Sequence, residues 1–197
     1  TAGLHFTDSI LNNLKKRRIE KLELTLHVGA GTFKPVTDDL IGTHEMHPEH
    51  FYMDRSQIIK LINNIEEVIA VGITSVRTLE SLYWLGLMIS EGKVKSSNDF
   101  FIDQWIPYKL KPKLNALDSL NGILEFMEKN NMEKIYGITR IIIVPGYRFK
   151  IVKGIITNYH MPRSTLLLLV AAFIGKDWRK VYDYALNNDF RFLSYGD

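Results

Sequence analysis

Residues 68–81 read VIAVGITSVRTLES, an apolar run that breaks directly into a glycine and then into a helical pattern. The apolar part predicts a buried strand, and the residues from 75 onward predict a helix. A strand that ends in a polar loop ahead of a helix brings polar groups to the carboxyl edge of a sheet, where α/β proteins bind ligands. This stretch therefore predicts an α/β fold with a site at that edge.

Three further apolar runs end in the same way. They cover residues 22–28, 141–144 and 155–156, and they lead into the loops GAGTF, PGYR and TNYHMPRST. Four such loops predict a composite small-molecule site in a single α/β domain over residues 1–197. We expect a layered α/β/α arrangement around a mixed, mostly parallel sheet.

The composition is that of an ordinary globular protein, with 46% hydrophobic and 24% charged residues. The absence of cysteine excludes a disulfide framework, a thiolate nucleophile and a Cys-ligated zinc, and it favours a cytoplasmic location. A net charge of +3 permits an anionic partner. The longest uncharged apolar run, 166–175, is too short to span a bilayer. Because the chain starts at Thr1, we expect a fragment or a processed product.

The loop after the first strand contains Gly29, Gly31 and Thr32. Glycine lets a backbone approach a ligand and present its N–H groups. The spacing matches neither a dinucleotide fingerprint nor a P-loop, so a ligand loop and a simple tight turn both remain open.

Residues 44–50, HEMHPEH, concentrate three histidines and two carboxylates within the stretch 37–55, which we predict to be a loop. The spacing is not HExxH, and Pro48 prevents a helix from aligning ligands, so we expect no metal. Imidazole titrates near neutral pH, which favours acid–base or substrate-contact roles for His44 and His47. The alternative is a solvent-exposed polar loop.

Two segments, TSVRT and HMPRST, each lead into a helix. Free N–H groups and hydroxyls at a helix start bind carboxylate or phosphate, and arginine adds a planar fork. The alternative is ordinary helix capping with exposed arginines. The candidates are Thr74, Ser75, Arg77, His160, Arg163, Ser164 and Thr165.

Several motifs occur together in a recognisable order: TAGLHFT, TLHVGAGTFKPV, HxMHxE, AVGITSVRTLES, PGY, ITNYHMPRSTLLLLVAAF and RFLSYGD. This series closely resembles the S-adenosylmethionine:tRNA ribosyltransferase-isomerase family of queuosine biosynthesis. The resemblance implies that the chain is the C-terminal, mostly α/β part of such an enzyme and lacks the family's small β-barrel domain. It also implies that about 45 extra residues intervene at 93–138 as an insertion. From the residues themselves, we expect the polar and then aromatic stretch 91–112 to be an excursion from the main fold, a flap or an insertion, and residues 116–130 to form a helix.

The resemblance further implies that the ribosyl part of S-adenosylmethionine, as co-substrate, is transferred to an aminomethyl-deazaguanine base of tRNA, giving epoxyqueuosine. Such chemistry needs a base for the proton beside the sulfonium, an acid for adenine, and clamps for the methionine carboxylate and the sugar. We expect His44 or His47, and then His27 and His160, as proton-transfer groups.

The remaining candidates would bind the cofactor. Gly29, Gly31 and Thr32 would line it, whereas Thr74, Ser75 and Arg77 would hold its methionine end or sugar. Arg163, Ser164 and Thr165 would bind an anionic group. We expect a monomer that contacts the tRNA anticodon arm and no membrane. The alternative function is a fragment that binds S-adenosylmethionine or tRNA without turnover.

Overall fold

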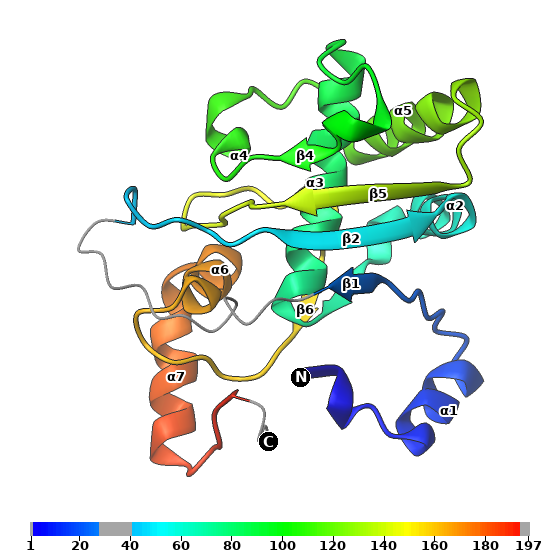
Figure 1. Cartoon of the computed structure of the whole chain (residues 1–197). Coiled ribbons are helices and arrows are strands. Elements are labelled where there is room, and N and C mark those ends of the chain that lie inside the picture. Colours follow the sequence, from blue (N-terminus) through cyan, green and yellow to red (C-terminus); the bar gives the residue numbers. More distant parts are fainter. Residues whose placement is uncertain (1, 28–40, 194–197) are drawn as a thin grey trace.

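The computed structural model of the protein describes residues 2–27 and 41–193 (Figure 1). Its larger sheet has the strand order β1-β2-β5-β4. The strands are β1 (Thr25–His27), β2 (Glu49–Asp54), β4 (Phe101–Ile102) and β5 (Lys134–Thr139). β2 runs antiparallel to both β1 and β5, and β4 runs parallel to β5. The chain is therefore α/β with a mixed sheet, as expected.

The larger sheet is less parallel than predicted, since two of its three strand pairings are antiparallel. The difference arises at β2, which occupies part of the stretch 37–55 that we expected to be a loop. Its buried residues Glu49, Phe51 and Met53 alternate with the more exposed His50 and Tyr52, a period of two that is typical of a strand.

A second, two-stranded sheet contains the expected parallel arrangement. β3 (Ile69–Val71) pairs with β6 (Gly154–Ile156), and Ala70 lies opposite Ile155. Gly72 follows β3 with a φ of 89° and donates its N–H to the Ile156 carbonyl at 2.9 Å. A positive φ favours glycine, so this residue allows the sharp turn into the next helix. The predicted strand at 141–144 does not form; β5 ends just before it.

Helix α3 (Ile73–Ser90) is the centre of the core, with thirteen of its eighteen residues buried. Helix α5 (Ala116–Lys129) packs closely against it. A Cβ added at Gly86 of α3 would lie 2.0 Å from the Ser119 carbonyl oxygen, so only glycine permits this approach. Helix α2 (Arg55–Asn63) contacts β2, and Phe51, Met53 and Ile135 belong to the core between the sheet and these helices.

Residues 91–112 are not an excursion from the main fold, since Phe100 and Ile102 belong to its buried core. The wider segment 93–138 is likewise part of the fold. It supplies β4, α5, the short helix α4 (Ile106–Lys109) and most of β5, and β5 lies between β2 and β4 in the larger sheet. The helix expected at 116–130 is confirmed as α5, whose Leu120, Ile123 and Met127 are buried. The expectation of an excursion at 91–112 was wrong because β4 has only two residues and gives no alternation beside the polar residues 95–99. The description of 93–138 as an insertion stays a prediction.

The remaining helices agree with the sequence pattern. α1 (Asp8–Lys16) begins after the cap residue Thr7. α6 (Thr165–Ile174) is capped by Ser164, whose hydroxyl accepts the Leu167 N–H, and ends at Gly175. α7 (Trp178–Asn187) follows. Short 3-10 helices cover Ala2–His5, Ile65–Glu67, Ser97–Asp99 and Gly175–Asp177. None of the helices formed by the described residues is both long and apolar enough to cross a membrane.

Candidate functional site

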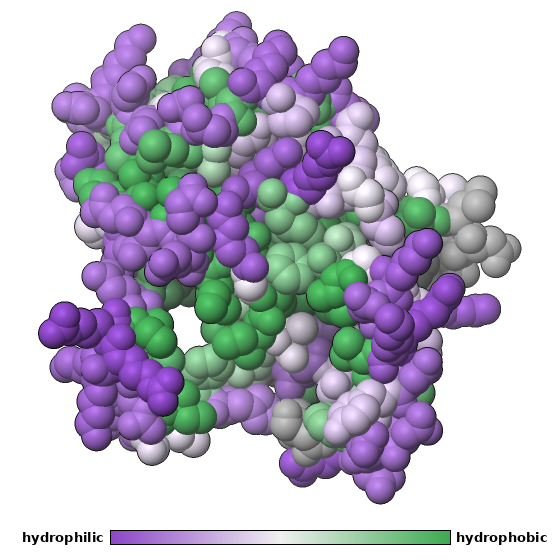
Figure 2. All heavy atoms as spheres, turned by 180° about the vertical axis from the view of Figure 1, so that it is seen from behind, coloured by the Kyte–Doolittle hydropathy of each residue, from purple (hydrophilic) through white to green (hydrophobic). Residues whose placement is uncertain are grey.

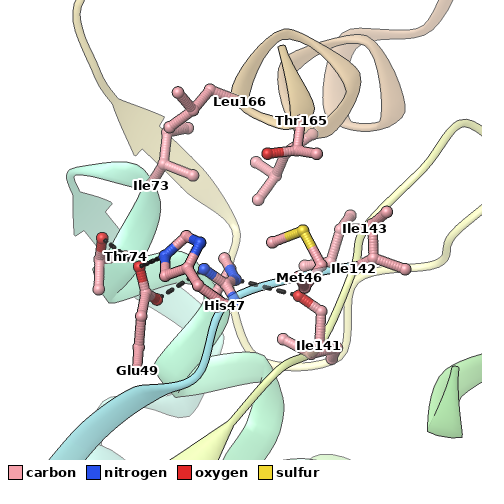
Figure 3. Close-up of a pocket in the computed structure, with 12 residues that line it drawn as sticks. Met46, His47, Glu49, Ile73, Thr74, Ile141, Ile142, Ile143, Thr165 and Leu166 are labelled. Atoms are coloured by element: carbon pink, nitrogen blue, oxygen red, sulfur yellow. Dashed lines mark hydrogen bonds and ion pairs between the residues drawn. The ribbon is translucent and has the colours of Figure 1, made fainter. Parts of the chain in front are cut away.

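A buried ion pair lies where β2 begins and α3 starts (Figure 3). Nη1 of Arg77 lies 2.7 Å from Oε2 of Glu49, and the two side chains are only 5% and 1% exposed. Gly72 directs α3 so that Arg77, in its second turn, faces the first residue of β2. A buried charge is tolerated when it is paired, so each of these residues depends on the other.

Arg77 has further hydrogen-bonding capacity. Its Nε donates to the Ile141 carbonyl at 3.0 Å, whereas its buried Nη2 has no hydrogen-bond partner among residues 2–27 and 41–193. Burial lowers the pKa of Arg77, and the charge of Glu49 opposes this change. Since a guanidinium stays protonated in proteins, Nη2 offers a donor to a ligand.

Two side chains contact the other oxygen of Glu49. His47 Nε2 lies 3.2 Å from Glu49 Oε1, and the Thr74 hydroxyl donates to the same oxygen across 3.4 Å. Figure 3 shows His47, Glu49 and Thr74 facing one another; Glu49 begins β2, Thr74 lies in α3, and His47 lies in the loop before β2. The carboxylate therefore links the histidine-rich loop to the start of α3.

These groups border a cavity of about 10 Å³, which is room for roughly one water molecule. Its polar side contains His47, Glu49, Thr74 and Arg77. Its other walls are Met46, Ile73, Ile141, Ile142, Ile143, Thr165, Leu166 and Leu169. The cavity thus joins the first turns of α3, the segment after β5, the histidine-rich loop with the start of β2, and the start of α6.

The loop that carries His47 is held from two directions. The Gln104 amide donates to the His44 carbonyl at 2.7 Å and accepts the Met46 N–H at 2.9 Å. Nε of Arg140 donates to the Met46 carbonyl at 2.8 Å. Because Gln104 belongs to the segment 93–138, that segment takes part in positioning the histidine loop.

Four of the predicted site residues meet at this cavity: His47, Thr74, Arg77 and Thr165. His44 lies at the start of the same loop and contributes its carbonyl to the Gln104 contact. Gly29, Gly31 and Thr32 lie outside the described residues.

The structure does not bring Ser75 or His27 to the cavity. Ser75 lines a separate groove of about 430 Å³ together with Arg17, Arg18 and apolar residues of β3. Figure 2 shows the molecule from behind, with hydrophobic surface in the middle of the view and hydrophilic surface around it. His27 is exposed at the end of β1 and lies opposite His50 in the sheet.

His160 is buried and connects its loop to α7. Its Nε2 lies 2.9 Å from the Thr157 hydroxyl, and its backbone N–H donates to the Tyr182 hydroxyl at 3.0 Å. Burial lowers the pKa of His160 to about 4, so the ring is neutral at pH 7. Among its neighbours, Ser164 serves as the α6 cap, and Arg163 is exposed with a φ of 55°.

Glu49 was not among the predicted site residues, although it is the last residue of the motif HxMHxE. The available signal was the alternation in EHFYMD, which places Glu49 on the same face as Phe51 and Met53. An acidic residue on the core face of a strand needs a partner, and that partner is Arg77. In the described part of the chain, no three His, Asp or Glu side chains cluster as metal ligands would; metal-free chemistry stays a prediction.

Comparison with known proteins adds to this geometry. The S-adenosylmethionine:tRNA ribosyltransferase-isomerase of Halothermothrix orenii is 37% identical over 201 residues, which cover 100% of this chain and 46% of that protein. The protein of the same name from Staphylococcus saprophyticus is 36% identical over 202 residues, with the same coverage. The chain thus spans about half the length of these relatives.

Among solved structures, the crystal structure of S-adenosylmethionine tRNA ribosyltransferase from Thermotoga maritima is similar, with a TM-score of 0.60 and 30% identity. The similarity covers 100% of this chain and 50% of that one. The family model described as queuosine biosynthesis protein matches residues 1–197. The chain therefore belongs to the queuosine biosynthesis protein family.

Proposed function

We propose that this chain is part of an enzyme that transfers and isomerises the ribosyl moiety of S-adenosylmethionine. The acceptor is the aminomethyl-deazaguanine base in the anticodon arm of tRNA, and the product is epoxyqueuosine. Relatives that match the whole chain are named for this reaction. The observation that carries the proposal is the buried Arg77, paired with Glu49 and retaining a spare donor beside His47.

Arg77 and Thr74 hold the sugar of S-adenosylmethionine. The charge of Arg77 is already neutralised by Glu49 at 2.7 Å, so its Nη2 suits a neutral ribose hydroxyl better than the methionine carboxylate. The cavity of about 10 Å³ accepts one hydroxyl-sized group, and the rest of the ligand lies outside it. The carboxylate binds near the start of α6, where Thr165 lines the cavity and helix N–H groups favour anions.

Proton transfer falls to His47, because its ring contacts Glu49 and lines the cavity. His44, His27 and His160 remain predicted alternatives. Gly29, Gly31 and Thr32 remain predicted to line the cofactor, and Ser75, Arg163 and Ser164 to contact its anionic or sugar groups. The monomeric state and the cytoplasmic location also remain predictions from the sequence.

The tRNA contacts the basic end of α1. Arg17 and Arg18 border the groove of about 430 Å³, together with Lys60. Cationic side chains bind phosphates with a strong dependence on salt. We therefore expect RNA affinity to fall steeply with ionic strength and to weaken when Arg17 and Arg18 are replaced by glutamine.

Calorimetric titration of the chain with S-adenosylmethionine tests the proposal, with and without an anticodon stem-loop that carries the aminomethyl base. We expect binding that weakens about tenfold in Arg77→Lys, since lysine lacks the planar fork. Arg179→Lys, on exposed α7, is the matched control. Equal binding by Arg77→Lys would contradict the role of Arg77. A lack of binding under both conditions would contradict the proposed function for this chain, and binding without adenine release would favour a non-catalytic fragment.

A further inference from the structure

The contact between His47 and Glu49 determines which ring nitrogen can act as a base. An ionised carboxylate only accepts hydrogen bonds, so at 3.2 Å the Nε2 of His47 is the donor to Glu49 Oε1. A neutral imidazole that carries its proton on Nε2 has its lone pair on Nδ1. This contact therefore selects Nδ1 of His47 as the basic nitrogen.

Glu49 is itself held in place. Its side chain is 1% exposed, Arg77 Nη1 lies 2.7 Å from Oε2, and the Thr74 hydroxyl lies 3.4 Å from Oε1. In the described part of the chain, the charged side chains near the histidine loop include Glu49 on β2, Arg77 on α3 and Arg140 after β5. Arg77 already balances the charge of Glu49. The main effect of the carboxylate on His47 is therefore to orient its ring, because the pair adds little net charge beside it.

The backbone ahead of His47 is equally constrained. The buried amide of Gln104 contacts both the His44 carbonyl and the Met46 N–H. A ring oriented by a side chain on one side and a fixed backbone on the other has few positions available. Such preorganisation is what a general base needs in order to reach its proton.

We propose that Glu49 is a positioning residue that fixes the Nε2–H form of His47, so that Nδ1 of His47 acts as the general base. The inference rests on the proposed function. In the step, the lone pair of Nδ1 takes a proton from the ribose carbon next to the sulfonium. The electron pair of that C–H bond stays on the carbon, which becomes an ylide. The imidazolium that forms keeps its Nε2–H bond to Glu49.

The first readout is the tautomer of His47, measured by ¹⁵N NMR of the histidine-labelled chain at neutral pH. We expect a protonated Nε2 and an unprotonated Nδ1. In Glu49→Gln the ring should become a mixture of both forms, since the amide can accept from or donate to it. Glu45→Gln, an exposed position in the same loop, is the control and should keep the wild-type spectrum.

The second readout is exchange of the sulfonium-adjacent protons of S-adenosylmethionine with D₂O, which needs no RNA. The wild-type chain, saturated with S-adenosylmethionine, should promote exchange of these protons. The His47→Gln variant should abolish this exchange, and Glu49→Gln should slow it at least tenfold. Glu49→Asp keeps the negative charge that pairs with Arg77, so this variant should fold. It should promote exchange of the ligand protons at a rate between those of wild type and Glu49→Gln. It therefore keeps the test decisive should Glu49→Gln unfold.

A His47 tautomer that is unchanged in both Glu49 variants would overturn the proposal. So would exchange that persists in His47→Gln at saturating S-adenosylmethionine. Either result would leave the proposed function standing, because that function is tested separately by calorimetry and adenine release.

Discussion

Two buried glutamates, one within helix α3 and one in contact with it, have opposite surroundings. Glu80, in the middle of the helix, accepts four hydrogen bonds, from the Tyr147 hydroxyl at 2.6 Å and from the backbone N–H groups of Lys150, Ile151 and Val152. Glu49, near the start of the helix, contacts three side chains, those of Arg77, His47 and Thr74. Both carboxylates are at most 1% exposed.

The difference separates a structural carboxylate from a functional one. The donors to Glu80 are mostly backbone N–H groups of residues 150–152, and each of its two oxygens accepts two hydrogen bonds. The partners of Glu49 include a ring that can exchange a proton and a guanidinium whose buried Nη2 has no hydrogen-bond partner among the described residues. A satisfied buried network rigidifies a fold, whereas an unsatisfied donor beside a cavity is available to a ligand.

The largest expected effect is on Glu80. Glu80→Ala would leave three backbone N–H groups and the Tyr147 hydroxyl buried without an acceptor. We expect the free energy of unfolding to fall by about 4 kcal/mol, measured by chemical denaturation. Glu128→Ala, on the exposed face of α5, should change it little. A loss below about 1 kcal/mol would show that the segment 147–152 does not depend on Glu80.

Acid should weaken the fold through His160. Burial lowers its pKa to about 4 from an ordinary 6.5, so the unfolded chain binds a proton first as the pH falls. The contribution of His160 to the free energy of unfolding is about 3 kcal/mol. It is fully present above pH 6.5 and is lost progressively as the pH falls to about 4.

Glu80 acts in the opposite direction. Burial raises its pKa despite its four hydrogen bonds, so protonation of this carboxyl favours the folded state as the pH falls. Denaturation at pH 7, 5.5 and 4 for wild type and His160→Gln separates the two groups. Equal acid sensitivity in both proteins would contradict the assignment to His160.

A smaller effect is expected for Tyr147→Phe. The Tyr147 hydroxyl donates to Glu80 at 2.6 Å and accepts from Trp84 Nε1 at 3.0 Å. Its removal should cost about 1 to 2 kcal/mol of unfolding free energy and leave binding of S-adenosylmethionine unchanged. If Tyr147→Phe bound S-adenosylmethionine more weakly at unchanged stability, the assignment of Glu80 as a purely structural carboxylate would be contradicted.

The smallest effect on stability should come from Thr74→Val. Its hydroxyl lies 3.4 Å from Glu49, a long hydrogen bond, so we expect a loss of less than about 1 kcal/mol. Binding of S-adenosylmethionine should weaken more clearly, and Thr74→Ser, which retains the hydroxyl, should restore it. Wild-type affinity in Thr74→Val would remove Thr74 from the site.

Local patterns in the sequence predicted much of the fold. The turn at Gly72, the Ser164 cap and the helices on either side of them follow from short-range rules on glycine, hydroxyl caps and apolar spacing. The strand β2 was missed because three histidines and a proline precede or interrupt its alternation. The role of 93–138 was missed because its strand β5 pairs with β2, which lies far away in the sequence.

The sequence by itself determined the α/β class, the family and the residue types available for chemistry. Only the tertiary structure decided that Arg77 pairs with Glu49 and binds the carbonyl of Ile141, 64 positions away. It likewise brought Gln104 to the histidine loop and left Ser75 on another face. The physical reason is that caps and turns depend on near neighbours, whereas a buried charge takes whichever partner the packing of strands and helices brings to it.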